Sequence, residues 1–74
     1  MLTLIQRDDC ALCDEAWEVL HQAGVGEFDS VFIDGNAELE MQYGARVPVL
    51  RNGRRELYWP FDAEQIKAWL ELFG

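Results

Sequence analysis

Two cysteines, Cys10 and Cys13, enclose Ala11 and Leu12, and they are the only cysteines of the 74-residue chain. A short apolar run that predicts a strand precedes them, and a segment with helical periodicity follows. The first sulfur is therefore expected at a helix start, where unpaired backbone N–H groups and the helix dipole favour the reactive thiolate. This arrangement predicts redox chemistry. The alternatives are thiols that only fill space, or a local disulfide worth about 2 kcal/mol.

The two sulfurs are expected to have different roles. Cys10, nearer to solvent, would attack a substrate disulfide, and Cys13, one turn further on, would resolve the mixed disulfide. Residues three apart share a helix face, so the sulfurs can meet without a backbone rearrangement. Nearby carboxylates oppose a further negative charge. Four of them surround the pair in the sequence: Asp8, Asp9, Asp14 and Glu15. Arg7 and Arg46 could offset these charges if they face the sulfur, or they could be solvated surface charges.

The charge of the chain excludes several classes of partner. Lys and Arg number 6 against 14 Asp and Glu, which gives a formal net charge of −8. Binding to nucleic acid or to anionic lipid needs clustered positive charge, so we expect neither partner. No signal segment is visible, and no run approaches the roughly 20 apolar residues that span a bilayer. We expect one domain over residues 1–74, a monomer in the cytoplasm, where the cysteines would be mostly reduced.

The first half of the chain predicts a strand, a helix and a second strand. A strand over 2–6 ends in a polar turn that offers Asp9 as a helix cap. Apolar residues at helical spacing predict a helix over 11–23, and Gly24 is a stop signal. A β-rich segment over 28–33 follows. Such a unit suits a parallel pair of strands joined by a right-handed crossover.

The second half begins with a brief helix over 37–43. Two strands follow, over 47–51 and 54–59, and they flank the dipeptide Asn52-Gly53. This dipeptide tolerates the positive φ angles of a type I′ turn, so the strands are predicted to form an antiparallel hairpin.

The last segment is a helix that begins after Asp62, a natural N-cap. Its apolar residues recur at helical spacing: Ile66, Trp69, Leu70 and Phe73. The complete order is β-α-β-α-β-β-α with a dithiol at the first helix. This order predicts an α/β protein of the thioredoxin fold, with a four-stranded mixed sheet flanked by three helices.

The chain also resembles the glutaredoxin-like branch of the thioredoxin superfamily over essentially its full length. Three segments carry the resemblance: Cys10-Ala11-Leu12-Cys13, Tyr43-Gly44-Ala45-Arg46-Val47-Pro48-Val49-Leu50 and Trp59-Pro60-Phe61-Asp62. The resemblance implies a thiol–disulfide oxidoreductase that acts on a disulfide-containing protein or a small thiol. It further implies that the Val47-Pro48 bond is cis and lies beside the dithiol. A trans proline at the start of an edge strand is the alternative.

The chain departs from ordinary glutaredoxins where they hold glutathione. Those proteins use a Thr-Val-Pro segment and a Gly-Gly turn followed by Asp. Here Arg46-Val47-Pro48 and Trp59-Pro60-Phe61-Asp62 take these places, and bulky rings replace the glycines. We therefore expect an aromatic-walled cleft for a larger or more apolar partner, although Trp59 and Phe61 could equally be packing residues. The expected substrate contacts are Leu12, Arg46, Val47, Pro48, Trp59 and Phe61.

No bound cofactor and no metal are expected, and glutathione is a candidate co-substrate. A structural zinc site needs four Cys or His ligands, and the chain has only three such residues, Cys10, Cys13 and His21. His21 is expected to be exposed on the polar side of the first helix. Two other functions stay open. One is a protein-binding module of the same fold with a quiet dithiol, and the other is the carriage of a metal ion or iron–sulfur cluster.

Overall fold

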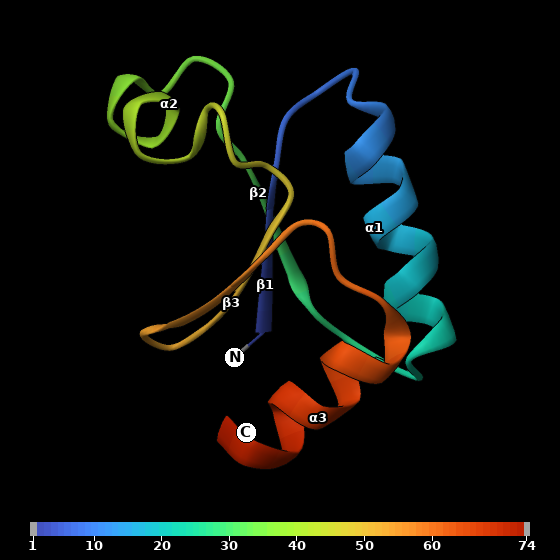
Figure 1. The fold of residues 1–74 in the computed structure, drawn as a ribbon. Coiled ribbons are helices and arrows are strands. Elements are labelled where there is room, and N and C mark those ends of the chain that lie inside the picture. The colour runs from blue at the N-terminus through green and yellow to red at the C-terminus, as the bar shows by residue number, and fades with distance from the viewer. Residues whose placement is uncertain (1, 74) are drawn as a thin grey trace.

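The computed structural model describes residues 2–73, except for the side chain of Phe73, so the predicted packing of that ring lies outside the described part. Its seven elements are β1 (Leu2–Gln6), α1 (Ala11–Gln22), β2 (Asp29–Phe32), α2 (Ala37–Tyr43), β3 (Val49–Asn52), β4 (Arg55–Tyr58) and α3 (Ala63–Phe73). The predicted order of elements is confirmed, and the fold is α/β of the thioredoxin type (Figure 1). Within residues 2–73, no helix has the length and apolar character needed to cross a membrane.

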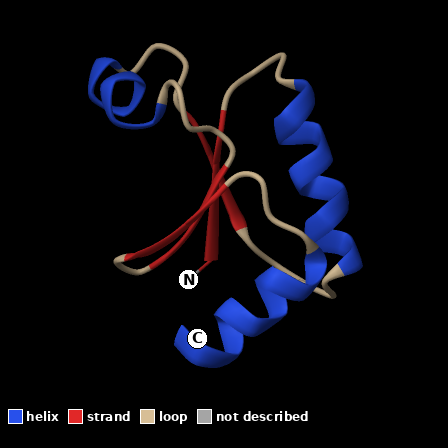
Figure 2. Ribbon diagram, in the orientation of Figure 1, coloured by secondary structure: helices blue, strands red, loops and turns tan. Residues whose placement is uncertain are grey.

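The four strands form one mixed sheet, drawn in red in Figure 2, and their order is β2-β1-β3-β4. Strand β1 pairs with β2 in parallel and with β3 in antiparallel orientation, and β3 pairs with β4 in antiparallel orientation. The parallel pair needs a long crossover, which α1 provides. Strands β1 and β3 are therefore central, and β2 and β4 are the edges.

Two apolar cores lie on opposite faces of this sheet. Successive side chains of a strand point to opposite faces, so Leu4 and its partner Leu50 face one side, while Ile5 and Val49 face the other. The first pair belongs to the main core, under α1 and α3: Leu4, Ala16, Leu20, Leu50, Phe61, Ile66 and Trp69. The second pair belongs to a smaller core that includes Tyr43 of α2: Ile5, Ile33, Tyr43 and Val49. The helices accordingly lie on both sides of the sheet (Figure 1).

Different caps begin the two longer helices. At α3, Gln65 N–H donates to Asp62 Oδ1 over 2.8 Å and Asp62 N–H donates to Gln65 Oε1 over 3.0 Å, so the predicted cap is confirmed as a reciprocal capping box. The prediction of Asp9 as the cap of α1 is wrong. Asp9 has a φ of 52°, whereas Cys10 has the extended backbone of an N-cap, and its sulfur accepts from the N–H of Cys13.

The turn between β3 and β4 also differs from the prediction. Asn52 is the last residue of β3, because it pairs both with Leu2 of β1 and with Arg55 of β4. The two-residue turn is therefore Gly53-Arg54 rather than Asn52-Gly53. Only Gly53 has a positive φ, 66°, which is the pattern of a type II′ turn, and the predicted type I′ turn is wrong.

Strands β2 and β3 are shorter than their predicted ranges. Phe28 precedes β2 and packs its ring against Trp17, with 4.8 Å between ring centroids. Strand β3 begins at Val49 rather than at residue 47, because the N–H of Val47 bonds to Tyr43 O at the end of α2. Pro48, which has no N–H to give to a sheet, lies just before the strand.

Gly44 ends α2 in a position that has no room for a side chain. Its N–H donates to Glu40 O over 2.8 Å. A Cβ atom here would collide with that same carbonyl oxygen and would lie 3.5 Å from Arg7 Nη2.

We expect Gly44→Ala to lower the free energy of unfolding by about 1–3 kcal/mol, because the last turn of α2 must shift to admit the methyl group. Gly26→Ala is the matched control, since a Cβ there meets nothing within 4 Å. Urea unfolding followed by tryptophan fluorescence measures both variants. Equal stability of the two would contradict the expected clash.

Candidate active site

The two thiols stand at the start of α1 with unequal access to solvent. Cys10 is partly exposed, Cys13 has 1% of its surface exposed, and both are free. The N–H of Cys13 donates to the Cys10 sulfur over 3.2 Å. A developing negative charge on Cys10 would be stabilised by this N–H and by the positive end of the helix. The geometry fits the predicted division between an attacking and a resolving sulfur.

The buried Cys13 holds its proton firmly. Burial, followed by the contact with the Cys10 sulfur, raises the pKa of Cys13 to about 11. A backbone hydrogen bond from Arg7 to the Cys13 sulfur opposes this rise. Cys13 is therefore a thiol at neutral pH, and it must lose a proton before it can act as a nucleophile.

Three predicted segments meet at one end of the sheet. Ile5, near the end of β1, is opposite Val49 at the start of β3, and Val49 is opposite Tyr58 at the end of β4. The loop to the dithiol, the Val47-Pro48 segment and the Trp59-Pro60 segment therefore all leave the sheet at this end. The Val47-Pro48 and Trp59-Pro60 peptide bonds are both cis. The β3–β4 hairpin lies at the opposite end of the sheet (Figure 1).

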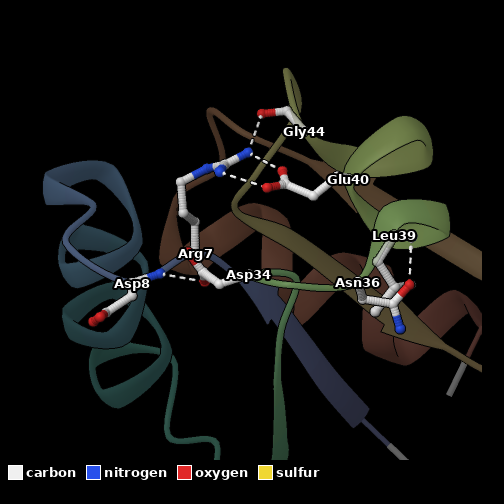
Figure 3. A network of polar contacts seen from close by, with 7 residues as sticks. All are labelled: Arg7, Asp8, Asp34, Asn36, Leu39, Glu40 and Gly44. Atoms are coloured by element: carbon white, nitrogen blue, oxygen red, sulfur yellow. Dashed lines mark hydrogen bonds and ion pairs between the residues drawn. The ribbon is translucent and has the colours of Figure 1, made fainter.

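A polar network fixes the loop that leads to Cys10 (Figure 3). Arg7 donates from Nη1 and Nη2 to the two carboxylate oxygens of Glu40, over 3.2 and 2.5 Å, and from Nη2 to Gly44 O over 3.2 Å. The N–H of Asp8 donates to Asp34 Oδ1 over 2.8 Å. The loop is thus attached to the end of α2 and to the turn after β2. Asn36 caps α2 by accepting from the N–H of Leu39 over 3.1 Å.

The two arginines that could offset the acidic residues have different partners. The hydrogen bond to Glu40 raises the pKa of Arg7, desolvation opposes this, and negative charge at Asp34 and at Cys10 raises it further. Arg7 is thus within electrostatic reach of Cys10. Arg46 is instead held over the ring of Tyr58, with its guanidinium carbon 5.5 Å from the ring centroid.

The other predicted contacts divide into accessible and buried residues. Leu12 is 46% exposed beside Cys10, whereas Val47 and Trp59 are half-buried and the Pro48 side chain is fully buried. Phe61 is only 4% exposed in the main core, and its ring meets that of Trp59 edge-on at 4.9 Å between centroids. Phe61 therefore packs inward, which is the packing alternative that the sequence left open, and it does not form a wall of the expected cleft.

One hollow in the described surface lies away from these residues. It has a volume of about 340 Å³ and is lined by Trp17, His21, Gly26, Glu27, Phe28 and Asp29, along the later turns of α1. His21 is exposed at this hollow, as its place on the helix predicted. No cluster of three or more His, Cys, Asp or Glu side chains suited to a metal ion occurs among residues 2–73.

Two residues near the site were not predicted. Gln6 is 3% exposed, and its Oε1 accepts from Trp17 Nε1 over 3.1 Å, while its Nε2 has no partner in the structure. Its alternation with Leu4 along β1 was the available signal that it faces the main core. Glu40 had no such signal, because its partner Arg7 is 33 residues away in the sequence.

Comparison with known proteins agrees with the fold. The model of the family described as "Glutaredoxin-like domain (DUF836)" matches residues 1–71. The X-ray structure of the structural genomics target XcR50 from X. campestris is similar, with 60% identity, a TM-score of 0.94 and complete coverage of both chains. Its solution structure has 61% identity and a TM-score of 0.91, covering 99% of this chain and 95% of the other. No curated protein matches. The chain belongs to the glutaredoxin-like domain family.

Proposed function

We propose that the protein is a thiol–disulfide oxidoreductase that uses Cys10 as the nucleophile and Cys13 as the resolving thiol. The observation that carries the proposal is the arrangement of the two sulfurs. One is accessible at a helix N-cap and accepts a backbone N–H, and the other is buried three residues later. Membership of the glutaredoxin-like family supports the same function.

The reaction consists of two exchanges of sulfur partners. The Cys10 thiolate attacks a substrate disulfide, so that one S–S bond forms, the substrate S–S bond breaks, and the released thiolate takes up a proton. Cys13 then loses its proton and attacks the Cys10 sulfur, which releases the second substrate thiol. Two electrons pass from the dithiol to the substrate. An external thiol, with glutathione as the candidate, returns them by the reverse exchanges.

Disulfides of proteins suit this site better than small anionic disulfides. The net charge of −8 opposes the approach of an anion, and charges within about 8 Å have the largest effect at physiological salt. The exposed Leu12 and the half-buried Val47 and Trp59 lie in the three segments at this end of the sheet, where they offer apolar contact to a partner chain. A reducing compartment such as the cytoplasm would keep the dithiol in the form that attacks.

We expect Cys10→Ser to abolish reduction of a protein disulfide such as that of insulin, because a serine hydroxyl cannot replace the thiolate. Cys13→Ser should instead accumulate a mixed disulfide between Cys10 and the substrate, visible as one covalent adduct by mass spectrometry. Unfolding curves of both variants control for loss of structure. Equal reduction rates for Cys10→Ser and the wild type would disprove the proposal. Reduction by neither protein would favour a binding module with a quiet dithiol.

The raised pKa of Cys13 predicts a distinct pH dependence. Iodoacetamide should label Cys10 first at neutral pH, and labelling of Cys13 should rise about tenfold per pH unit until it levels near pH 11. Because the folded state holds this proton more tightly than the unfolded chain, the contribution of Cys13 to stability is complete below about pH 9 and is lost as pH rises through about 11. Peptide mapping of the labelled cysteines measures the first effect. Labelling of Cys13 that levels near pH 9 would contradict its burial.

A further inference from the structure

The cationic group closest to the nucleophile in the sequence already holds a carboxylate. Arg7 lies three residues before Cys10, and its two terminal nitrogens meet both oxygens of Glu40. This two-point geometry is the one in which a guanidinium recognises a carboxylate of any origin. Glu40 therefore occupies the place that a carboxylate of a substrate would take.

The end of α2 is built to hold Arg7 in this position. Gly44 O accepts from Arg7 Nη2 over 3.2 Å, and Glu40 lies one turn earlier on the same helix. Figure 3 shows both acceptors on the same side of the guanidinium group. Unpaired carbonyl groups at a helix end carry partial negative charge, which adds to the attraction for a cation. A Cβ atom at Gly44 would lie 3.5 Å from Arg7 Nη2, so the backbone of this residue approaches the guanidinium group closely.

The ion pair is also accessible to small molecules. The side chains of Arg7 and Glu40 are 33% and 38% exposed, so a dissolved carboxylate can reach the guanidinium group if Glu40 gives way. Arg7 belongs to the short loop between β1 and the N-cap Cys10, three residues before the sulfur, and negative charge at Cys10 raises the pKa of the guanidinium group. A small disulfide that binds Arg7 through a carboxylate would therefore be near the sulfur that attacks it. Glu40 opposes this binding in two ways. It occupies the guanidinium group, and its negative charge repels the carboxylate of the substrate.

We propose that Glu40 determines substrate specificity by closing the Arg7 guanidinium group to carboxylates of small disulfides. The inference rests on the proposed function and adds the substrate class. Disulfides without a nearby carboxylate are accepted, whereas small anionic disulfides find their cationic site already filled. Glu40 acts through Arg7 and does not touch the reacting sulfur atoms.

The test compares two small disulfides on the reduced full chain. Glutathione disulfide carries carboxylates, and bis(2-hydroxyethyl) disulfide is neutral. For each protein we take the ratio of the two second-order rate constants of mixed-disulfide formation at Cys10, the anionic over the neutral substrate. A changed thiolate fraction at Cys10 alters both rates equally, so the ratio isolates recognition of the carboxylate.

Glu40→Gln should raise this ratio roughly fivefold at low ionic strength, and added salt should reduce the gain. Glu38→Gln is the matched control, because it removes the same charge from an exposed position of the same helix. It should leave the ratio within about a factor of 1.5 of the wild type. Arg7→Gln in the Glu40→Gln background should cancel the gain. An unchanged ratio in Glu40→Gln, or an equal rise in Glu38→Gln, would overturn the inference.

A binding measurement separates this inference from the proposed function. S-methylglutathione carries the same carboxylates but cannot exchange its sulfur. In an NMR titration it should shift the Arg7 side-chain signals of Glu40→Gln at concentrations that leave those of the wild type unchanged. Identical shifts in both proteins would overturn the inference. Absence of exchange with the neutral disulfide by any protein would instead count against the proposed enzyme.

Discussion

The pairing of β1 with β3 determines where every part of the site lies. The register that places Ile5 opposite Val49 and Leu4 opposite Leu50 also separates the two cores, since these pairs face opposite sides of the sheet. The same register brings the end of β1 and the start of β3 to the same end of the sheet. The dithiol loop and the Val47-Pro48 segment are neighbours for this reason, although almost forty residues of chain separate them. Slippage by one residue would exchange the two cores and move both segments.

The electrostatic environment of the dithiol depends on which charged side chains pair with each other, and the number of charged residues nearby does not determine it. The sequence places several carboxylates near Cys10, yet the electrostatics also depend on Arg7 and on what Arg7 contacts. Glu40 forms an ion pair with Arg7 and so offsets its positive charge. Asp34 holds the loop by accepting a hydrogen bond from the backbone N–H of Asp8. The guanidinium group in the loop before Cys10 is thus paired with a carboxylate from α2.

Local sequence patterns predicted the helices and strands well. They gave wrong predictions where the position of a residue depends on contacts with residues far away in the sequence. Helical spacing, the Asp62 cap and the glycine stop signals are properties of neighbouring residues, so α1, α2 and α3 could be predicted from the sequence. The turn after β3 could not, because pairing of Asn52 with Leu2 of β1 decides where that strand ends. Phe61 lies between a proline and an aspartate without a periodic context, so only the assembled core shows which way its ring points. No pattern of neighbouring residues predicts the Arg7–Glu40 ion pair, because the two residues are 33 positions apart.

The cap of α1 connects the chemistry of the site to the backbone. Cys10 is at once the proposed nucleophile and the acceptor for the N–H of Cys13, so the first turn of the helix is closed by a reactive atom. A sulfur engaged in a disulfide is a poorer acceptor than a thiolate, and the cap weakens when the bond forms. Hydrogen–deuterium exchange at the Cys13 amide would then report the covalent state of its neighbour, and in the proposed reaction the first turn of α1 would loosen each time the disulfide forms.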